Sequence, residues 1–253
     1  MAKWILGVDI GGTGIKAAPV DVTTGRLKGE RHRIDTPQPP TPDRVVDVVA
    51  ELAREWNWSG PVGVGFPGVV THGVTRTAAN LHPDWLGFDA AATLTERLGA
   101  PVTVVNDADA AGLAEVKYGA AAGHHGLVVM ITLGTGIGSG LFLDGHLVPN
   151  TEFGHLEVDG RDAEDRAAAI VREEKHLSWK AYAKRVDRYL KTVENLLWPD
   201  LIVLGGGVSD SFDKFGKHLH RRTPVVAASA GNDAGIIGAA LARAAHAARR
   251  AAG

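Results

Sequence analysis

A chain of 253 residues with 45% hydrophobic and 22% charged residues is typical of a globular protein with one large domain or two small ones. Its net charge of −2 argues against nucleic acid or an anionic membrane as a partner, and the absence of cysteine excludes disulfides, thiolate catalysis and cysteine-bound zinc. No apolar run approaches the ~20 residues that cross a bilayer, so we expect a cytoplasmic protein.

The first half predicts an opening set of strands followed by alternating helices and strands. Apolar runs, helical spacing and turn residues place these elements. The expected strands cover residues 4–10, 15–22, 26–34, 62–64 and 101–105, and the expected helices cover 44–56, 89–98 and 108–118.

The second half repeats this opening. A strand at 127–133 runs into Gly134-Thr135-Gly136 and a return strand at 137–143, and Asp144-Gly145 predicts a hairpin to a strand at 146–148. Helices at 162–174 and 179–197, strands at 201–204 and near 225–226, and a closing helix from about residue 234 follow.

This internal duplication predicts two α/β lobes with both glycine turns at a shared cleft. We expect a smaller N-terminal lobe over residues 1–105 and a larger C-terminal lobe over 106–236, with the helix at 237–253 packing back on the first.

The glycine turns are candidate phosphate sites, because exposed backbone N–H groups in such turns bind anions. They comprise Gly11, Gly12, Thr13 and Gly14, with Lys16 nearby, and Gly134, Thr135 and Gly136. Asp9 could hold Mg²⁺ through water. A dinucleotide site would need a helix directly after Gly14, and Pro19 and Gly25 leave little room for one. A plain structural turn remains the alternative for either turn taken alone.

Five motifs carry a resemblance to the ROK family of sugar kinases and repressors, in which they occur in the same order. They are Asp9-Ile-Gly-Gly-Thr13, Gly65-Phe-Pro-Gly68, Asn106-Asp107, Leu133-Gly-Thr-Gly-Ile-Gly138 and Glu152-Phe-Gly-His155. Within this family the chain is most similar to the bacterial polyphosphate glucokinases of the polyphosphate/ATP-dependent glucomannokinase type. The resemblance implies an α/β actin-like/hexokinase (ribonuclease H-like) fold of two duplicated lobes.

The resemblance also implies residue roles. Asp107 matches the catalytic base, Gly205, Gly206 and Gly207 match a nucleotide-binding run, and the sugar-binding positions are Gly68, Asn80, Asn106, Asp107, Glu152, His155 and Glu157. Simpler interpretations exist: Asp107 or Asn106 could cap a helix, and the glycine run could be a strand-to-helix turn. Many members hold zinc with a histidine at the position of His155 and three cysteines; without cysteine, no zinc site is expected.

The implied activity is transfer of the terminal phosphoryl group of polyphosphate or ATP, with Mg²⁺, to O6 of glucose, with mannose as a second acceptor. An ATP-only hexose kinase is the first alternative, and a non-catalytic sugar-binding protein, a repressor or an actin-like filament protein are remote ones. A homodimer stays open. A polyphosphate tail would need a basic path along the protein surface. Candidates for this path, which could equally form an ordinary solvated face, are Lys175, His176, Lys180, Lys184, Arg185, Lys214 and Lys217.

Overall fold

The computed structural model describes residues 2–78 and 81–252. Compact packing divides the chain into unit 1, residues 1–114 with 232–253, and unit 2, residues 115–231. The sequence-based boundaries lay at 105/106 and 236/237. The division falls later in the helix α3 (Asp107–Tyr118), because the first part of α3 packs on the C-terminal helix α8 (Ala234–Ala252). A Cβ on Gly238 of α8 would lie 1.6 Å from the carbonyl oxygen of Ala110.

Unit 1 is built on a five-stranded sheet in the order β3-β2-β1-β4-β7. Its strands are β1 (Trp4–Ile10), β2 (Gly14–Asp21), β3 (His32–Asp35), β4 (Val62–Phe66) and β7 (Val102–Asn106). β1, β4 and β7 are parallel, whereas β2 and β3 are antiparallel neighbours on the other side of β1. The third strand is shorter than the predicted 26–34, because Gly29, at φ +120°, lies in a bend that ends at Glu30.

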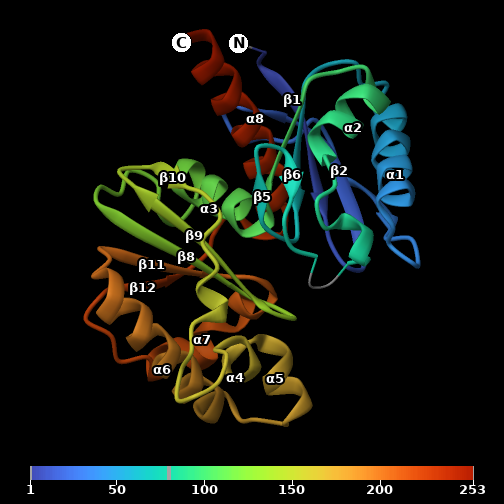
Figure 1. Cartoon of the computed structure of the whole chain (residues 1–253). Coiled ribbons are helices and arrows are strands. Elements are labelled where there is room, and N and C mark those ends of the chain that lie inside the picture. The colour runs from blue at the N-terminus through green and yellow to red at the C-terminus, as the bar shows by residue number, and fades with distance from the viewer. Residues whose placement is uncertain (1, 79–80, 253) are drawn as a thin grey trace. The chain divides into compact units, whose positions relative to one another are not determined.

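The two faces of this sheet have different coverings (Figure 1). Apolar residues of β1 and β4 pack with the helices α1 (Pro42–Glu55) and α2 (Ala90–Leu98) in one core. On the other face, Gly7 and Gly63 are neighbours in the parallel register, and a Cβ on either would lie about 2 Å from a carbonyl oxygen of α8. A short hairpin of β5 (Val70–Thr71) and β6 (Val74–Thr75) follows β4.

Unit 2 repeats the same sheet plan in the order β10-β9-β8-β11-β12. Its strands are β8 (Leu127–Leu133), β9 (Ile137–Leu143), β10 (His146–Val148), β11 (Leu201–Gly205) and β12 (Val225–Ala227). β8, β11 and β12 are parallel, and β9 and β10 are antiparallel. The two sheets therefore have the same strand order and directions, which agrees with the internal duplication seen in the sequence.

In unit 2, apolar side chains of the helix α6 (Trp179–Leu197) pack in one core with those of β8 and β11. The predicted helix at 162–174 is two helices, α4 (Glu164–Ala167) and α5 (Ala169–Glu174), with extended backbone at Ala168 between them. After the break, the Ile170 N–H donates to the Gly134 carbonyl oxygen. A short helix α7 (Phe212–Phe215) completes the unit. No helix in residues 2–78 and 81–252 is long and apolar enough to cross a membrane.

Candidate active site

Three parallel strands of unit 1 bring the predicted site residues to one edge of the sheet. Asp9 precedes the last residue of β1, Gly65 is its neighbour on β4, and Phe66 at the end of β4 pairs with Asn106 at the end of β7. The carboxyl edge of parallel strands is where α/β proteins place reactive groups. The sequence motifs in unit 1 therefore meet at one place. Asn80, a predicted sugar ligand, lies outside the described residues.

The first glycine turn joins β1 to β2 and is supported by residues around β3. The turn is closed by a hydrogen bond from the Gly11 N–H to the Gly14 carbonyl oxygen. Thr36 donates its hydroxyl to the Gly11 carbonyl oxygen at 2.5 Å, and the Arg33 guanidinium donates to the Thr13 carbonyl oxygen at 2.9 Å. Hydrogen bonds from Thr36 and Arg33 thus fix the carbonyl oxygens of the turn. Gly12 and Thr13 at its tip are exposed, so they are accessible to a ligand.

Asp9 and Lys16 are opposite each other in the antiparallel register, with the carboxylate and ammonium 3.7 Å apart. Burial raises the pKa of the Asp9 carboxyl, and the Lys16 ammonium opposes that shift. Gly235 at the start of α8 lies against this carboxylate, and a Cβ there would be 2.8 Å from Asp9 Cγ. Within the described residues, no three His, Asp or Glu side chains are grouped to hold a metal ion. One carboxylate can still serve Mg²⁺, which typically takes one or two carboxylates with waters and substrate phosphates.

Asn106 and Asp107 have different hydrogen-bond partners. The Asn106 side-chain oxygen accepts from the N–H groups of Ala108 and Asp109, at 2.8 and 3.0 Å, and so caps α3. Its amide nitrogen donates to the Gly68 carbonyl oxygen at 3.2 Å. Asn106 thus ties the Gly65–Gly68 loop to the helix start, while the partly buried Asp107 accepts from the Ala108 N–H at 2.8 Å.

The second glycine turn, between β8 and β9, is supported by both sides of the break at Ala168. A Glu164 carboxylate oxygen accepts from the Ile137 N–H at 2.7 Å, and the Ile170 N–H donates to the Gly134 carbonyl oxygen at 3.1 Å. A Cβ on Gly136 would lie 2.3 Å from that Glu164 oxygen. Glycine at 136 therefore lets the carboxylate reach the turn, and Thr135 at the tip stays exposed.

The segment Glu152–His155 is docked on β9. The hydroxyl of the buried Ser139 donates to the Thr151 carbonyl oxygen at 2.6 Å and accepts from the Phe153 N–H at 2.9 Å. A Cβ on Gly154 would lie 2.2 Å from the Ile137 carbonyl oxygen, so glycine permits this close approach. The segment and the second glycine turn consequently share β9 as their support.

Electrostatics distinguish the two predicted sugar ligands of this segment. Burial raises the pKa of Glu152, an effect reduced by His155 and increased by Glu164. A hydrogen bond between His155 Nδ1 and Asp162, at 3.0 Å, raises the pKa of His155. Glu157 is exposed and lines a pocket beside α6, so its place differs from that of Glu152.

The predicted nucleotide-binding run begins at Gly205, the last residue of β11, which is the parallel neighbour of β8. Gly206 has φ +78°, and a Cβ there would lie 2.4 Å from the Leu133 carbonyl oxygen, so only glycine fits. Gly207 and the second glycine turn line one pocket of about 420 Å³ together with Arg172 and Trp179. The Arg172 guanidinium stacks on the Trp179 ring, 3.7 Å from its centroid. The Gly205–Gly207 run is a close strand-to-helix turn and also part of a pocket wall.

Sequence reasoning did not find Glu164, Ser139 or Asp162, which position the motifs of unit 2. Each of them forms its hydrogen bond with a residue at least seven positions away in the sequence, and none belongs to a recognisable sequence motif. Ser139 offered one weak signal, as a polar residue expected to be buried in a strand.

Comparison with known proteins assigns the family. The ROK family model matches residues 5–176. The chain belongs to the ROK family. The polyphosphate glucokinase of Mycobacterium tuberculosis is 53% identical over 237 residues, covering 93% of this chain and 89% of that relative.

Solved structures agree with this ROK assignment. The inorganic polyphosphate/ATP-glucomannokinase from Arthrobacter sp. strain KM has a TM-score of 0.92 and 51% identity, covering 97% of this chain and 100% of the other. A ROK family glucokinase from Streptomyces griseus, in complex with glucose and AMPPNP, has a TM-score of 0.83 and 26% identity, covering 96% and 99%. The predicted actin-like/hexokinase fold is thereby confirmed.

Proposed function

We propose that this protein is a cytoplasmic glucokinase that transfers the terminal phosphoryl group of polyphosphate or ATP to O6 of glucose, with mannose as a second acceptor. Support comes from the 53% identity to a polyphosphate glucokinase and the 51% identity to a polyphosphate/ATP-glucomannokinase, each over more than nine-tenths of the chain. The observation that carries the proposal is the gathering of Asp9, the Gly68 loop and Asp107 at the carboxyl edge of one sheet.

Asp107 is proposed as the general base. It takes the proton of the O6 hydroxyl as the bond from O6 to phosphorus forms and the bond from phosphorus to its bridging oxygen breaks, leaving ADP or a polyphosphate shortened by one unit. A base of this kind contributes about 10²–10⁴-fold to the rate. Because Asn106 caps α3, this assignment does not require Asp107 to serve as the principal helix cap.

The donor phosphates are assigned to the two glycine turns and to Lys16. Backbone N–H groups at exposed turn tips and a nearby ammonium offset the negative charge on transferring phosphates. Asp9 would hold Mg²⁺ through water, and the ion would supply further charge neutralisation. For ATP, the pocket formed by Gly134, Thr135 and Gly207 is the proposed nucleoside site, since it adjoins the second turn.

Glucose hydroxyls are assigned to Glu152 and His155, with Gly68, Asn80, Asn106 and Glu157 as further proposed contacts. Asp162 engages Nδ1 of His155, which leaves Nε2 for a sugar hydroxyl. Support for Glu157 is weaker than for Glu152, because it is exposed beside α6.

A coupled assay of glucose 6-phosphate formation, run with ATP and with long-chain polyphosphate, tests the proposal. We expect turnover of glucose with both donors and a lower rate with mannose. Turnover with ATP alone would make the protein an ATP-only hexose kinase, and binding of glucose without turnover by either donor would make it a sugar-binding protein.

A further inference from the structure

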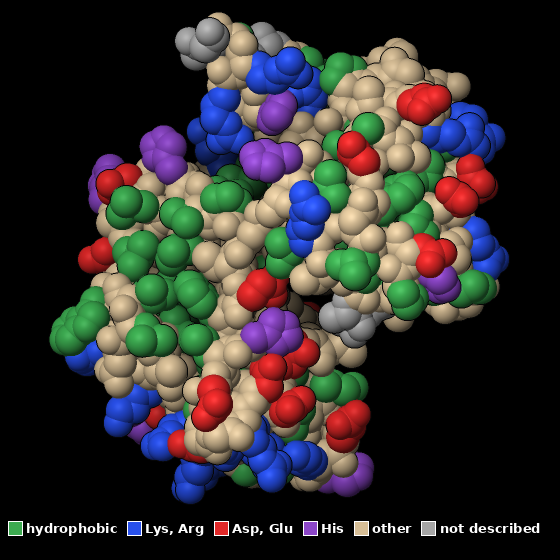
Figure 2. Space-filling view, in the orientation of Figure 1, with side chains coloured by type: hydrophobic (Ala, Val, Ile, Leu, Met, Phe, Trp, Pro, Cys, Tyr) green, Lys and Arg blue, Asp and Glu red, His purple; other side chains and the backbone are tan. Residues whose placement is uncertain are grey.

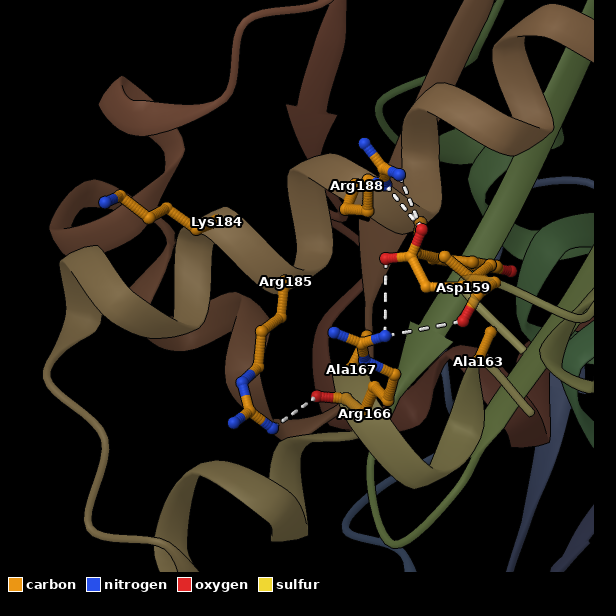
Figure 3. Close-up of a pocket in the computed structure, with 9 residues that line it drawn as sticks. Asp159, Ala163, Arg166, Ala167, Lys184, Arg185 and Arg188 are labelled. Carbon is orange, nitrogen blue, oxygen red and sulfur yellow. Dashed lines mark hydrogen bonds and ion pairs between the residues drawn. The ribbon is translucent and has the colours of Figure 1, made fainter. Parts of the chain in front are cut away.

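Two adjoining pockets lie beside α6 in unit 2, of about 450 and 310 Å³. Val158, Asp159 and Arg188 line both, so the two pockets adjoin, and we call them together the α6 groove. Figure 3 shows the larger of the two. The larger part also includes residues of α4, and the smaller part continues along α6 to Lys191 and Asn195.

The α6 groove is positively charged in a chain whose net charge is −2. Its walls carry the carboxylates of Glu157 and Asp159 against five cations, Arg166, Lys184, Arg185, Arg188 and Lys191. In the surface view, Lys and Arg side chains lie over the end of unit 2 that holds α4–α6, with Asp and Glu side chains beside them (Figure 2). A concave surface lined by one sign of charge attracts ligands of the opposite sign.

Within the described residues, internal ion pairs involve two of the five cations of the α6 groove. Arg166 and Arg188 both bond to the same Asp159 carboxylate, and the Arg188 bond holds the pKa of Asp159 below its usual value. Arg185 donates only to a backbone carbonyl oxygen, that of Arg166, at 3.3 Å. Lys184 has no ion pair within the described part of the chain (Figure 3).

Pairing with Asp159 explains the positions of Arg166 and Arg188 but not those of the lysines on α6. Lys184, Arg188 and Lys191 follow one face of α6 at helical spacing, as does Lys180 one turn earlier. Like charges three or four residues apart weaken a helix. Asp159 neutralises Arg188 in the middle of the stripe, whereas Lys184 and Lys191 have no ion pair within the described residues. Asp187 lies three residues after Lys184 and four before Lys191, on the same side of α6, but its carboxylate pairs with Arg221. The stripe therefore points to a ligand rather than to a self-paired helix surface.

The length and position of the α6 groove fit a chain of phosphates. Lys184 and Lys191 are roughly 10 Å apart along the helix axis, farther than one phosphate group reaches. Val158 follows His155 closely in the chain, and Arg166 is in the same short helix as Glu164, which binds the second glycine turn. One wall of the α6 groove is thus made by residues that follow, in the chain, the segments with the proposed sugar and donor contacts.

We propose that the α6 groove binds the phosphates of long-chain polyphosphate that lie beyond those entering the reaction. Guanidinium and ammonium groups are the usual protein partners of phosphate. Several of them in a row increase the affinity for polyphosphate without taking part in the phosphoryl transfer. This inference rests on the proposed function and assigns the polyphosphate tail to Lys184, Arg185, Arg166, Arg188 and Lys191. Of the sequence candidates it selects Lys184 and Arg185, whereas Lys175, His176, Lys180, Lys214 and Lys217 line neither part of the groove.

The test compares Lys184→Gln/Arg185→Gln with the matched control Lys180→Gln, which removes one charge from α6 outside the α6 groove. KM is measured for long-chain polyphosphate, tripolyphosphate and ATP, and binding of long-chain polyphosphate is measured directly. For the double variant we expect KM and Kd for long-chain polyphosphate to rise about ten-fold, as the loss of one exposed and one partly buried charge contact would give. KM for tripolyphosphate and ATP should stay unchanged, which also shows that the variant folds.

Three results would overturn the inference: an unchanged Kd for long-chain polyphosphate in the double variant, an equal loss in Lys180→Gln, or an equal rise in KM for ATP. Failure of the proposed donor is distinguishable from these. If the wild-type protein uses ATP but not polyphosphate, the donor assignment fails. Direct binding then decides about the groove: no binding to the wild type overturns it, and binding lost in the double variant supports it as an anion site.

Discussion

At the scale of single residues, neighbouring polar side chains in this protein have separate tasks. Asn106 holds the start of α3 and the Gly68 loop, and Asp107 next to it is the proposed base. Asp162 holds His155 at one ring nitrogen, and His155 is a proposed sugar ligand. In both pairs one residue fixes the geometry in which the other works, which is how precise sites are usually supported.

The Asp162–His155 contact predicts a pKa change. Replacing Asp162 with Asn keeps an acceptor for Nδ1 but removes the charge that favours the imidazolium, so the pKa of His155 should fall toward its ordinary value. Because the folded pKa is raised, this pair stabilises the fold below the unfolded pKa of histidine and ceases to do so as pH rises through the folded pKa. An NMR titration of the His155 ring in both proteins checks this; identical titration curves would contradict it.

At the scale of elements, each glycine turn depends on contacts from distant segments. Thr36 and Arg33 hold the first turn, and Glu164 and Ile170 hold the second. The break at Ala168 is what allows α4 and α5 each to contribute one of the contacts at the second turn. The turns are therefore parts of the tertiary structure and not isolated hairpins.

Gly136 and Glu164 should behave as one unit. Glu164→Ala leaves the Ile137 N–H without its carboxylate, at a cost of about 1.5–3 kcal/mol in the free energy of unfolding. Gly136→Ala displaces the same carboxylate and should cost a similar amount, but little more once Glu164 is already Ala. Urea unfolding of both single variants and the double variant measures this coupling. Additive losses would show that the two residues act independently.

The sequence predicts most elements because their patterns are local. The bounds of β1, β8, β9, β10 and α6 agree with the predicted ranges, since buried strands read as apolar runs and α6 has a strongly amphipathic pattern. The break at Ala168 was not predictable, because the Ile170 N–H leaves the helical pattern for a carbonyl 36 residues earlier in the chain. The supporting roles of Glu164, Ser139 and Asp162 escaped for the same reason.

At the scale of the whole molecule, two sheets of the same topology have separate hydrophobic cores. Unit 1 also needs the end of the chain, because α8 covers one face of its sheet through close backbone approach at Gly7 and Gly63. On α8, Gly235 lies against the Asp9 side chain of β1, and Gly238 lies against the Ala110 carbonyl oxygen of α3. None of these four glycines leaves space for a larger side chain. The C-terminal helix is thus a structural part of the N-terminal unit.

Gly63→Ala should therefore destabilise unit 1 selectively. Its Cβ would lie 1.9 Å from the Ala239 carbonyl oxygen, a backbone atom that cannot rotate away, and we expect a cost of about 3 kcal/mol. Hydrogen exchange should accelerate in β1 and β4 and stay slow in β8 and β11. Gly207→Ala, where a Cβ would meet nothing within 4 Å, is the control and should leave both units unchanged. Equal acceleration in both units would mean that they unfold as one.

The proposed function depends above all on Asp107, at the carboxyl edge of the unit 1 sheet, as the base for phosphoryl transfer to a sugar. The most direct measurement is the turnover of glucose by Asp107→Asn beside the wild type, with glucose binding measured on the same samples by calorimetry. We expect kcat to fall by about 10²–10⁴-fold with either donor while the Kd for glucose changes little. Wild-type turnover in Asp107→Asn would contradict it.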